Sequence, residues 1–201
     1  MERLEQQMQF ALEVDQEKRI YRQTYCSDGE TLENDAEHAW HAALMAVLLS
    51  EYANESFDVL KTVTMLLIHD IVEIDAGDTY AYDDAGIATQ AERERNAANR
   101  IFGILPDDQS KKMMDLWLEF EAGETAEARF AKVMDKVQPI MLNAATDGRA
   151  WKEHEVKLSK ILDRNKKTPE GSQILWDYML QNFIMPNVEK GNIEDDRESI
   201  Q

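Results

Sequence analysis

Cysteine is almost absent from this chain of 201 residues, and glycine and proline are scarce. The single cysteine, Cys26, cannot form an internal disulfide, and eight Gly and four Pro leave little material for the many turns of an all-β fold. Apolar runs are short: none approaches the ~20 residues that a membrane-spanning helix needs. No basic, apolar segment of the signal-peptide type opens the sequence. These absences predict a cytoplasmic protein without a membrane partner.

Positively charged residues are also scarce. Lys and Arg number 22 against 40 Asp and Glu, so the formal net charge is −18. Such a surface repels the phosphates of duplex nucleic acid and of anionic lipid, and we expect neither as a partner. Hydrophobic residues still make up 43%, enough for one sizeable core. We therefore expect one domain over residues 1–189, followed by an acidic, frayed tail over residues 190–201.

Apolar residues recur mainly at helical spacing, which predicts an all-α fold of about six to eight helices in one bundle. The segments between them, including residues 21–31 and the acidic residues 79–86, read as loops. The predicted helices cover residues 4–20, 36–49, 56–76, 87–104, 106–122, 126–144, 151–165 and 172–189. Asn34 or Asp35 can cap the second helix. From Ala39 to Leu49 that helix is apolar almost all round, which is typical of a helix surrounded by others.

The third predicted helix carries charge among its apolar residues. On a helical wheel centred on Val63, Asp70 falls inside the arc of apolar side chains that includes Leu60 and Leu67. A buried carboxylate costs several kcal/mol unless a cation or a full set of hydrogen bonds meets it. His69 and Glu73 form an i, i+4 pair on the neighbouring flank. Two explanations stay open here: a bound metal, or an aspartate satisfied by an arginine or by helix N-terminal amides.

The chain has only four histidines. His38 and His41 stand at the start of the most apolar helix, and His69 lies on the following helix, which should be its antiparallel neighbour. Imidazoles from His38 and His69 with the carboxylate of Asp70 and one further carboxylate would suit Mn²⁺, Co²⁺, Fe²⁺, Ni²⁺ or Zn²⁺. We expect His41 and His154 to be ordinary structural histidines. No Cys cluster, Gly-rich phosphate loop, G-x-S-x-G or H-E-x-x-H motif is present. The sequence therefore lacks the motifs typical of nucleotide-binding folds, serine hydrolases and zincins.

Three segments occur in a fixed order: residues 37–41 (EHAWH), residues 65–78 (MLLIHDIVEIDAGD) and residues 132–136 (KVMDK). Together they resemble the HD-domain metal-dependent phosphohydrolases, and most closely the small single-domain branch that contains the 5′-deoxynucleotidases. The resemblance extends from about residue 19 to residue 143. It implies an HD-type helical bundle and one divalent metal ion, which would be Mn, Co, Fe, Ni or Zn, with Mg as a further option.

The resemblance also implies roles for individual residues. The metal ligands would be His38, His69, Asp70 and Asp135. Periodicity alone places Asp135 off the apolar stripe of its helix and predicts a solvated side chain, although Pro139, four residues on, should kink the helix there. Glu73 and Asp78 would position and deprotonate the attacking water, and Arg22, in preference to Arg19, would hold the substrate phosphate. Residues 24–31 depart from the deoxynucleotidase pattern.

These residues predict a phosphomonoesterase that acts on nucleoside 5′-monophosphates. One alternative is a hydrolase of another phosphate ester or of a polyphosphorylated nucleotide, which should show additional basic residues; only the scattered Lys132, Lys136 and Arg149 stand out. Another is a non-catalytic metal- or nucleotide-binding sensor, which would need neither Glu73 nor Asp78. We allow for a homodimer.

Overall fold

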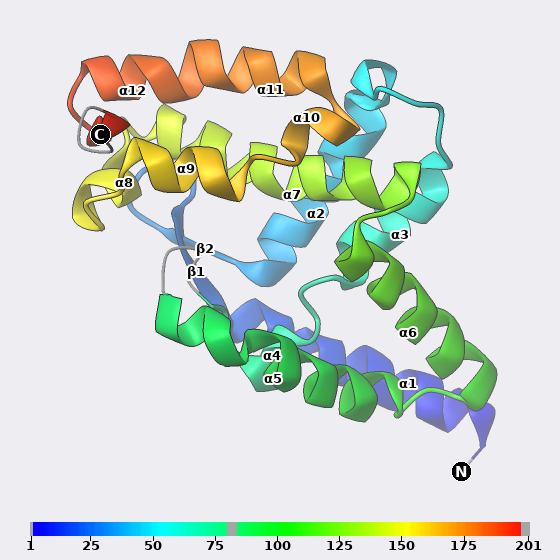
Figure 1. The fold of residues 1–201 in the computed structure, drawn as a ribbon. Coiled ribbons are helices and arrows are strands. Elements are labelled where there is room, and N and C mark those ends of the chain that lie inside the picture. Colours follow the sequence, from blue (N-terminus) through cyan, green and yellow to red (C-terminus); the bar gives the residue numbers. More distant parts are fainter. Residues whose placement is uncertain (1, 80–83, 198–201) are drawn as a thin grey trace.

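A computed structural model describes residues 2–79 and 84–197, and almost all of its regular structure is helical (Figure 1). Its α-helices are α1 (Arg3–Glu13), α2 (Asp35–Leu48), α3 (Val59–Ile68), α4 (Glu73–Ala76), α5 (Asp84–Phe102), α6 (Asp107–Ala122), α7 (Ala126–Ala145), α8 (Arg149–Glu153), α9 (Leu158–Arg164), α10 (Thr168–Gly171), α11 (Gln173–Met179) and α12 (Met185–Glu189). The 3₁₀ turns η1 (Val14–Arg19) and η2 (Ser50–Tyr52) and the π-helical segment η3 (Leu180–Ile184) complete the helical elements in these residues. The predicted all-α fold is confirmed.

A small β-hairpin replaces the loop predicted after the first helix. Strand β1 (Tyr21–Tyr25) pairs antiparallel with β2 (Leu32–Asn34). The aromatic and β-branched residues of β1 favour an extended strand, and Gly29 supplies the positive φ of 71° that the connecting turn requires. Asp28 fixes the same turn by accepting hydrogen bonds from backbone N–H groups. The hairpin holds Arg22 beside the helices that carry the functional residues.

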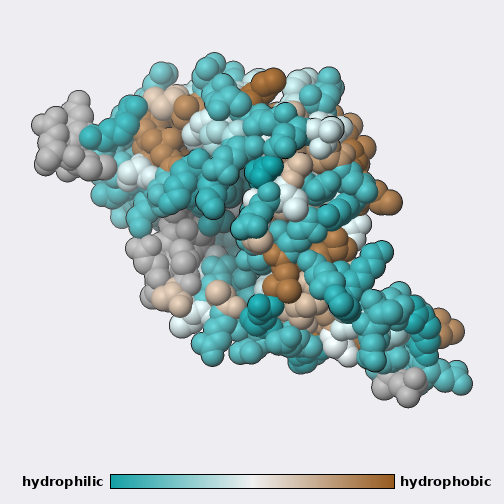
Figure 2. Space-filling model, turned by 45° about the vertical axis from the view of Figure 1, so that its right-hand side comes forward, coloured by the Kyte–Doolittle hydropathy of each residue, from teal (hydrophilic) through white to brown (hydrophobic). Residues whose placement is uncertain are grey.

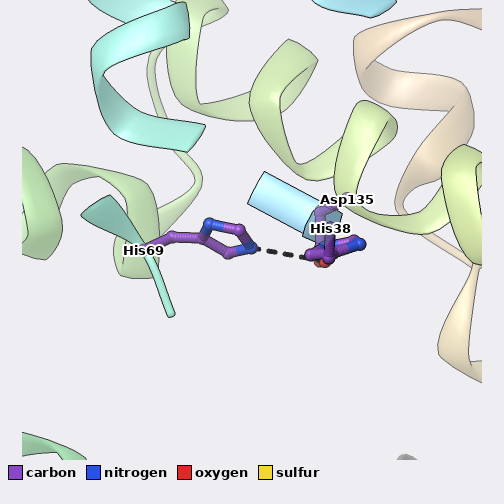
Figure 3. A group of neighbouring side chains, drawn as sticks. All are labelled: His38, His69 and Asp135. Carbon is purple, nitrogen blue, oxygen red and sulfur yellow. Dashed lines mark hydrogen bonds and ion pairs between the residues drawn. The ribbon is translucent and has the colours of Figure 1, made fainter. Parts of the chain in front are cut away.

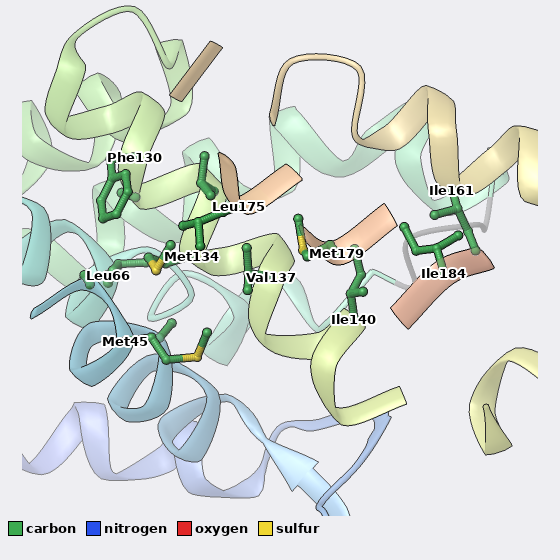
Figure 4. Close-up of a cluster of buried hydrophobic side chains, with 14 of the residues drawn as sticks. Met45, Leu66, Phe130, Met134, Val137, Ile140, Ile161, Leu175, Met179 and Ile184 are labelled. Carbon is green, nitrogen blue, oxygen red and sulfur yellow. The ribbon is translucent and has the colours of Figure 1, made fainter. Parts of the chain in front are cut away.

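Helix α7 lies at the centre of the fold, in contact with α2, α3, α6, α10 and α11 (Figure 1). Its apolar stripe forms most of the main core, in which Phe130 and Met134 pack with Met45 of α2, Leu66 of α3 and Met179 of α11 (Figure 4). A second core lies between α4, α5 and α6 and includes the following buried residues: Ile68, Ile71, Val72, Ala98, Ile101, Phe102 and Trp117.

The chain passes from the first core to the second at His69 and Asp70, and there the predicted third helix is interrupted. Helix α3 ends at Ile68 and α4 begins at Glu73, so the prediction of one helix over residues 56–76 is wrong. Leu66 faces the first core while Ile71 faces the second. Because the chain changes direction between α3 and α4, one apolar run contributes side chains to both cores. The segment ends at Ala76, as predicted, and Gly77 follows it with a φ of 75°.

Helix α2 is buried on one face and exposed on the other, which corrects the expectation of a helix surrounded by neighbours. Its small residues Ala42 and Ala46 face α3 and α7 and are fully buried. The exposed residues recur at i, i+4, i+7 and i+8: Trp40 (62% exposed), Leu44 (43%), Val47 (52%) and Leu48 (63%). The wheel was also wrong for Leu60 and Leu67 of α3, which are exposed. At the N-terminus, Asn34 caps α2 through a reciprocal bond pattern with Glu37.

The end of the described chain packs against the fold. Ile193 is buried, Glu194 forms a β-bridge with Lys157, and Asp196 accepts a hydrogen bond from the backbone N–H of Ser159. The expected fraying therefore does not hold for residues 192–196, because they have these partners; residues 198–201 of that tail, like residues 80–83 of the predicted acidic loop, lie outside the described residues. Hydrophilic side chains cover most of the face in Figure 2. Within the described residues, no helix is both long and apolar enough to cross a membrane.

Candidate metal centre

Three side chains from distant segments of the chain meet at the junction of the two cores (Figure 3). His38 comes from the first turns of α2, His69 follows the last residue of α3, and Asp135 comes from the middle of α7. Each offers one ligand atom, and these atoms lie within 4.8 Å of one another. His38 is fully buried, and 19% of the Asp135 side chain is exposed, so the solvated position that periodicity predicted for Asp135 is corrected. The tight packing of α2, α3 and α7 brings the three together.

Hydrogen bonds at Nδ1 orient both imidazole rings. His69 Nδ1 donates to the carbonyl of Leu66 at 2.8 Å, and His38 Nδ1 lies 2.8 Å from Oε1 of Gln138. Gln138 turns its NH₂ group toward Glu33, so its oxygen is the atom that accepts from His38. In the neutral form of both rings, the lone pair is therefore on Nε2. These Nε2 atoms lie 3.2 Å (His38) and 3.6 Å (His69) from Oδ1 of Asp135.

The Nε2 lone pairs face the carboxylate of Asp135, and a cation between them would stabilise this arrangement. The electrostatic environment of His69 also favours positive charge here. His69 Nε2 is buried and has no hydrogen-bond partner among the described residues. Burial lowers the pKa of His69, but the charges of Asp70 and Asp135 outweigh this and raise that pKa to about 9. Imidazole nitrogens with carboxylate oxygen are a donor set that suits Mn, Co, Fe, Ni or Zn. The residues present therefore fit a divalent metal ion.

Asp70 lies beside this group and meets a cation of the protein itself. Its Oδ2 is 3.2 Å from His69 Nε2 and 3.9 Å from His38 Nε2, and it accepts a hydrogen bond of 2.8 Å from Arg22. Arg22 also reaches Asp35 at 3.2 Å. Of the two explanations left open by the sequence, the structure shows the arginine. The same oxygen also faces the imidazoles, so metal ligation by Asp70 stays a prediction.

Three further carboxyl groups are buried in the neighbourhood of Asp70. Burial, together with the neighbouring acids, raises the pKa of Glu17 to about 8. Burial also raises the pKa of Glu33 and of Asp35 to about 7, although Arg22 acts in the opposite direction on both. These side chains are at most 7% exposed. Near neutral pH this region therefore holds protonated carboxyl groups, which limits the negative charge around a single guanidinium.

Glu73 and Asp78, to which the resemblance assigns the attacking water, lie beside the candidate metal centre. They line, with His69 and Asp135, a cavity that we call the inner cavity; Phe120 and Glu94 complete much of its wall. Burial and the charges of Asp70 and Asp35 raise the pKa of Glu73 well above its usual range, and burial raises that of Asp78. Two acids with raised pKa values beside a cation site are suited to accept and release protons.

Gln138 is a site residue that sequence reasoning missed. It is fully buried, and it joins His38 to Glu33 and to His41, whose Nδ1 lies 3.1 Å from Gln138 Nε2. The signal was available: Gln138 follows Met134 by four residues and so falls on the apolar stripe of α7, as Asp70 falls on that of α3. His41 contacts Gln138 and not the candidate ligands in the hydrogen bonds of the described residues, and His154 is exposed at the end of α8.

Two cations also border the centre without having been assigned to it. Lys136 and Arg164 line the inner cavity, and they also line a second cavity beyond Asp135, which we call the α7–α8 cavity; its wall includes Ile140 and Trp151. Neither cation has a carboxylate partner in an ion pair among the described residues. Burial and the charge of Arg164 lower the pKa of Lys136, although Asp135 raises it. Arg149, also noted in the sequence, pairs instead with Glu153.

Comparison with known proteins gives three matches that agree. The sequence model of the HD domain family matches residues 14–176. The human protein 5′-deoxynucleotidase HDDC2 is 29% identical over 135 residues, which are 67% of this chain and 65% of that protein. A crystal structure of a predicted metal-dependent phosphohydrolase from Magnetospirillum magnetotacticum MS-1 is 46% identical and superposes with a TM-score of 0.90, covering 95% of both chains.

The chain thus spans about two thirds (65%) of the length of the human relative. The matched family residues run from η1 to α11 and include His38, His69 and Asp135, the side chains whose geometry fits a cation, and Asp70 beside them. By this match, and by its helical architecture, the chain belongs to the HD-domain family.

Proposed function

We propose that the chain is a metal-dependent phosphomonoesterase that acts on nucleoside 5′-monophosphates. One divalent ion would be held by His38, His69, Asp70 and Asp135. The observation that carries the proposal is the convergence of two imidazole lone pairs on the carboxylate of Asp135, with acids and cations lining the cavity in front of them. The names of the human and Magnetospirillum relatives, a 5′-deoxynucleotidase and a metal-dependent phosphohydrolase, support the same reaction class.

A bound divalent ion would supply Lewis acidity to a phosphoryl oxygen and would make water a better nucleophile near neutral pH. The chain's own residues supply the rest. Glu73 or Asp78 takes the proton of the attacking water, since both line the inner cavity and have raised pKa values. Lys136 and Arg164 offset the charge of the other phosphate oxygens. Arg22 assists them from the cavity wall while it holds Asp70 in place.

Metal removal tests this proposal. Chelation should abolish phosphate release from a panel of nucleoside 5′-monophosphates, and added Mn²⁺ or Co²⁺ should restore it. Sustained turnover in excess chelator, with metal absent by elemental analysis, would overturn the proposal. Metal binding without release of phosphate from any ester in the panel would favour the non-catalytic sensor.

One observation favours polyphosphorylated nucleotides as a second class of substrate. Four cations line a further cavity beside the inner one: Arg129, Lys132, Lys136 and Lys167. Two of them have partners, because Arg129 pairs with Glu55 and Lys132 with Glu121. The basic residues that looked scattered in the sequence thus partly gather in space. Nucleoside triphosphates belong in the same assay panel, and a kcat/KM for a triphosphate above that for the matching monophosphate would establish this second class.

We also propose that two copies of the chain associate through the exposed face of α2. Residues Trp40, Leu44, Val47 and Leu48 form an uncharged strip on a chain with a net charge of −18, so two copies can meet there with less charge repulsion than elsewhere. Light scattering on the wild-type chain and on Trp40→Glu would test this, with a dimer expected only for the first. A cytoplasmic location and the absence of duplex nucleic acid as a partner remain predictions.

A further inference from the structure

The two cavities that open on Asp135 differ in chemistry. The inner cavity has mostly charged and polar side chains on its wall, including Glu73 and Glu94, and offers a base little apolar surface. The α7–α8 cavity shares some of these charged side chains, among them Asp135, but adds Pro139, Ile140 and Trp151 together with amide side chains. A pocket with apolar walls and a few placed polar groups is the usual environment of a small organic ligand. Of the two, only the α7–α8 cavity suits a nucleoside.

Helix α7 presents its functional groups to this cavity in a fixed order. Asp135 and Lys136 come first, Pro139 and Ile140 follow one turn later, and Asn143 follows after a second turn; all of them line the cavity. Positions 135, 139 and 143 share one face because they are four residues apart. At 1.5 Å per residue, the eight residues from Asp135 to Asn143 span about 12 Å. Anion-binding, apolar and hydrogen-bonding groups thus succeed one another over the length of an extended nucleotide.

Asn143 is the unusual member of this series. It is 7% exposed, and its Nδ2 donates to the carbonyl of Pro139 at 2.8 Å, which fixes the direction of the amide. Its Oδ1 is buried and has no hydrogen-bond partner among the described residues. A buried acceptor without a donor is unfavourable and is rare in native proteins. The side chain is therefore poised to receive a donor when the cavity is filled.

Asn165 shows that an amide on the same wall need not be left in this state. It also lines the cavity and is 2% exposed. Its Nδ2 donates to the carbonyl of Ile161 at 2.9 Å, and its Oδ1 accepts from the hydroxyl of Thr168 at 3.2 Å. Both of its polar atoms are used within the protein. The lack of a donor to Asn143 Oδ1 among the described residues is thus a property of that residue and not of the cavity wall in general.

We infer that the α7–α8 cavity holds the nucleoside of the substrate, and that Asn143 Oδ1 accepts a hydrogen bond from an N–H on the Watson–Crick edge of the base. The inference rests on the proposed phosphomonoesterase function, since it places the phosphate at Asp135 and Lys136. The sugar and base then lie along Pro139 and Ile140. Adenine, cytosine, guanine and thymine all carry an N–H on that edge. An acceptor at this position therefore selects for a base without choosing strongly among the four.

A pair of substrates tests the inference in the wild-type chain. The pair is 2′-deoxyadenosine 5′-monophosphate and its analogue with hydrogen in place of the 6-amino group. Loss of one hydrogen bond to a buried acceptor should lower kcat/KM for the analogue by about tenfold. Equal kcat/KM values would overturn the inference. A tenfold loss on removal of the sugar 3′-hydroxyl, with none on removal of the amino group, would overturn it as well.

Variants then show which residue reads the amino group. Asn143→Leu has a similar shape and no acceptor, so the two nucleotides should become equivalent, within about twofold. Asn165→Leu is the matched control and should keep the tenfold difference. Circular dichroism tests whether each variant is folded. The comparison of the two nucleotides in the wild-type chain does not depend on the folding of any variant. Discrimination retained by folded Asn143→Leu would contradict the assignment.

Two further measurements separate this inference from the proposed function. Release of phosphate from 2-deoxyribose 5-phosphate, which has no base, tests hydrolysis alone; if it proceeds while the nucleotide pair is not distinguished, the function stands and the inference fails. If no ester is hydrolysed, the function fails, and calorimetry with 2′-deoxyadenosine and its 6-hydrogen analogue still decides the inference. Tighter binding of 2′-deoxyadenosine by about tenfold supports it, and equal binding or none contradicts it.

Discussion

The two sides of the imidazole pair differ in the partners that the protein gives them. On the Nδ1 side, His38 and His69 donate to Gln138 and to the carbonyl of Leu66. On the Nε2 side, the same rings face the carboxylates of Asp135 and Asp70, and neither carboxylate has a hydrogen to give. The protein thus completes one side by itself and leaves the other for a cation. This difference identifies a binding site more directly than burial does, because both sides are buried.

The same contrast continues away from the metal centre. Glu73 Oε2 and Asn143 Oδ1 are buried and have no hydrogen-bond partner in the part of the chain that the structure describes, and both residues line cavities that open on Asp135. In contrast, Gln138 uses both ends of its amide within the protein. The predictions below remove groups from one side or the other, in order of decreasing effect on activity.

Removal of Asp70 should have the largest effect. Asp70→Ala should lose the metal ion and all measurable phosphate release. The wild-type chain should gain thermal stability when metal is added, as ligand binding to the native state requires, and the variant should not. Differential scanning calorimetry with and without Mn²⁺ measures this. A variant that keeps one metal ion per chain would show that Asp70 serves only as the partner of Arg22.

Replacement of the proton acceptor should have the next largest effect. Glu73→Gln should keep the metal and the fold while lowering kcat by about 10²–10⁴-fold, the usual contribution of one general acid or base. Steady-state kinetics and metal analysis on the same sample measure both. Normal turnover by Glu73→Gln with loss of turnover in Asp78→Asn would assign the base to Asp78, and wild-type rates in both would contradict the mechanism.

Gln138→Leu tests the Nδ1 side of the imidazole pair, where the protein itself supplies the hydrogen-bond partners. It removes the acceptor for His38 and the donor to Glu33, so the ring should lose its orientation. Groups that orient metal ligands in this way typically contribute about 10–100-fold to metal affinity or activity, and we expect a loss in that range. Competition with a chromophoric chelator measures the affinity. An unchanged affinity would mean that packing alone orients His38.

Thr125→Ala provides the smallest effect and a control within the same helix. Thr125, which precedes Asp135 by ten residues, caps α7 by accepting a hydrogen bond from the backbone N–H of Ala128. Loss of the cap should lower the free energy of unfolding by about 1 kcal/mol. Metal affinity and kcat should not change. A large loss of metal affinity would show that the centre depends on the stability of α7 as a whole, and the contrast between the two sides would then explain less.

The sequence was informative where one residue departs from a local pattern. Asp70 stood out as a charge among apolar residues, and the structure places it at the junction of the two cores, 9% exposed. The reasoning was only partly right, because the helix on which the wheel was drawn ends at Ile68 and leaves Leu60 exposed. The cap at Asn34 was found from capping rules, which depend on a few neighbouring residues.

The remaining features depend on contacts between distant segments. Asp135 lies off the apolar stripe of α7, and only the resemblance pointed to it; its role follows from how α2 and α3 pack on that helix. Lys136 and Arg164 are 28 residues apart and meet only in the folded chain. The exposed face of α2 could not be predicted either, since an apolar strip that covers a core and one that faces solvent have the same composition.

Calorimetric titration of the metal-free chain with Mn²⁺ or Zn²⁺ tests the central claim most directly, because it requires no substrate. If the Nε2 side is completed by a cation, the wild-type chain should bind one ion, and Asp135→Ala, which removes the carboxylate that both imidazoles face, should bind none under the same conditions. Absence of binding to the wild-type chain, or undiminished binding to folded Asp135→Ala, would contradict the assignment of this centre.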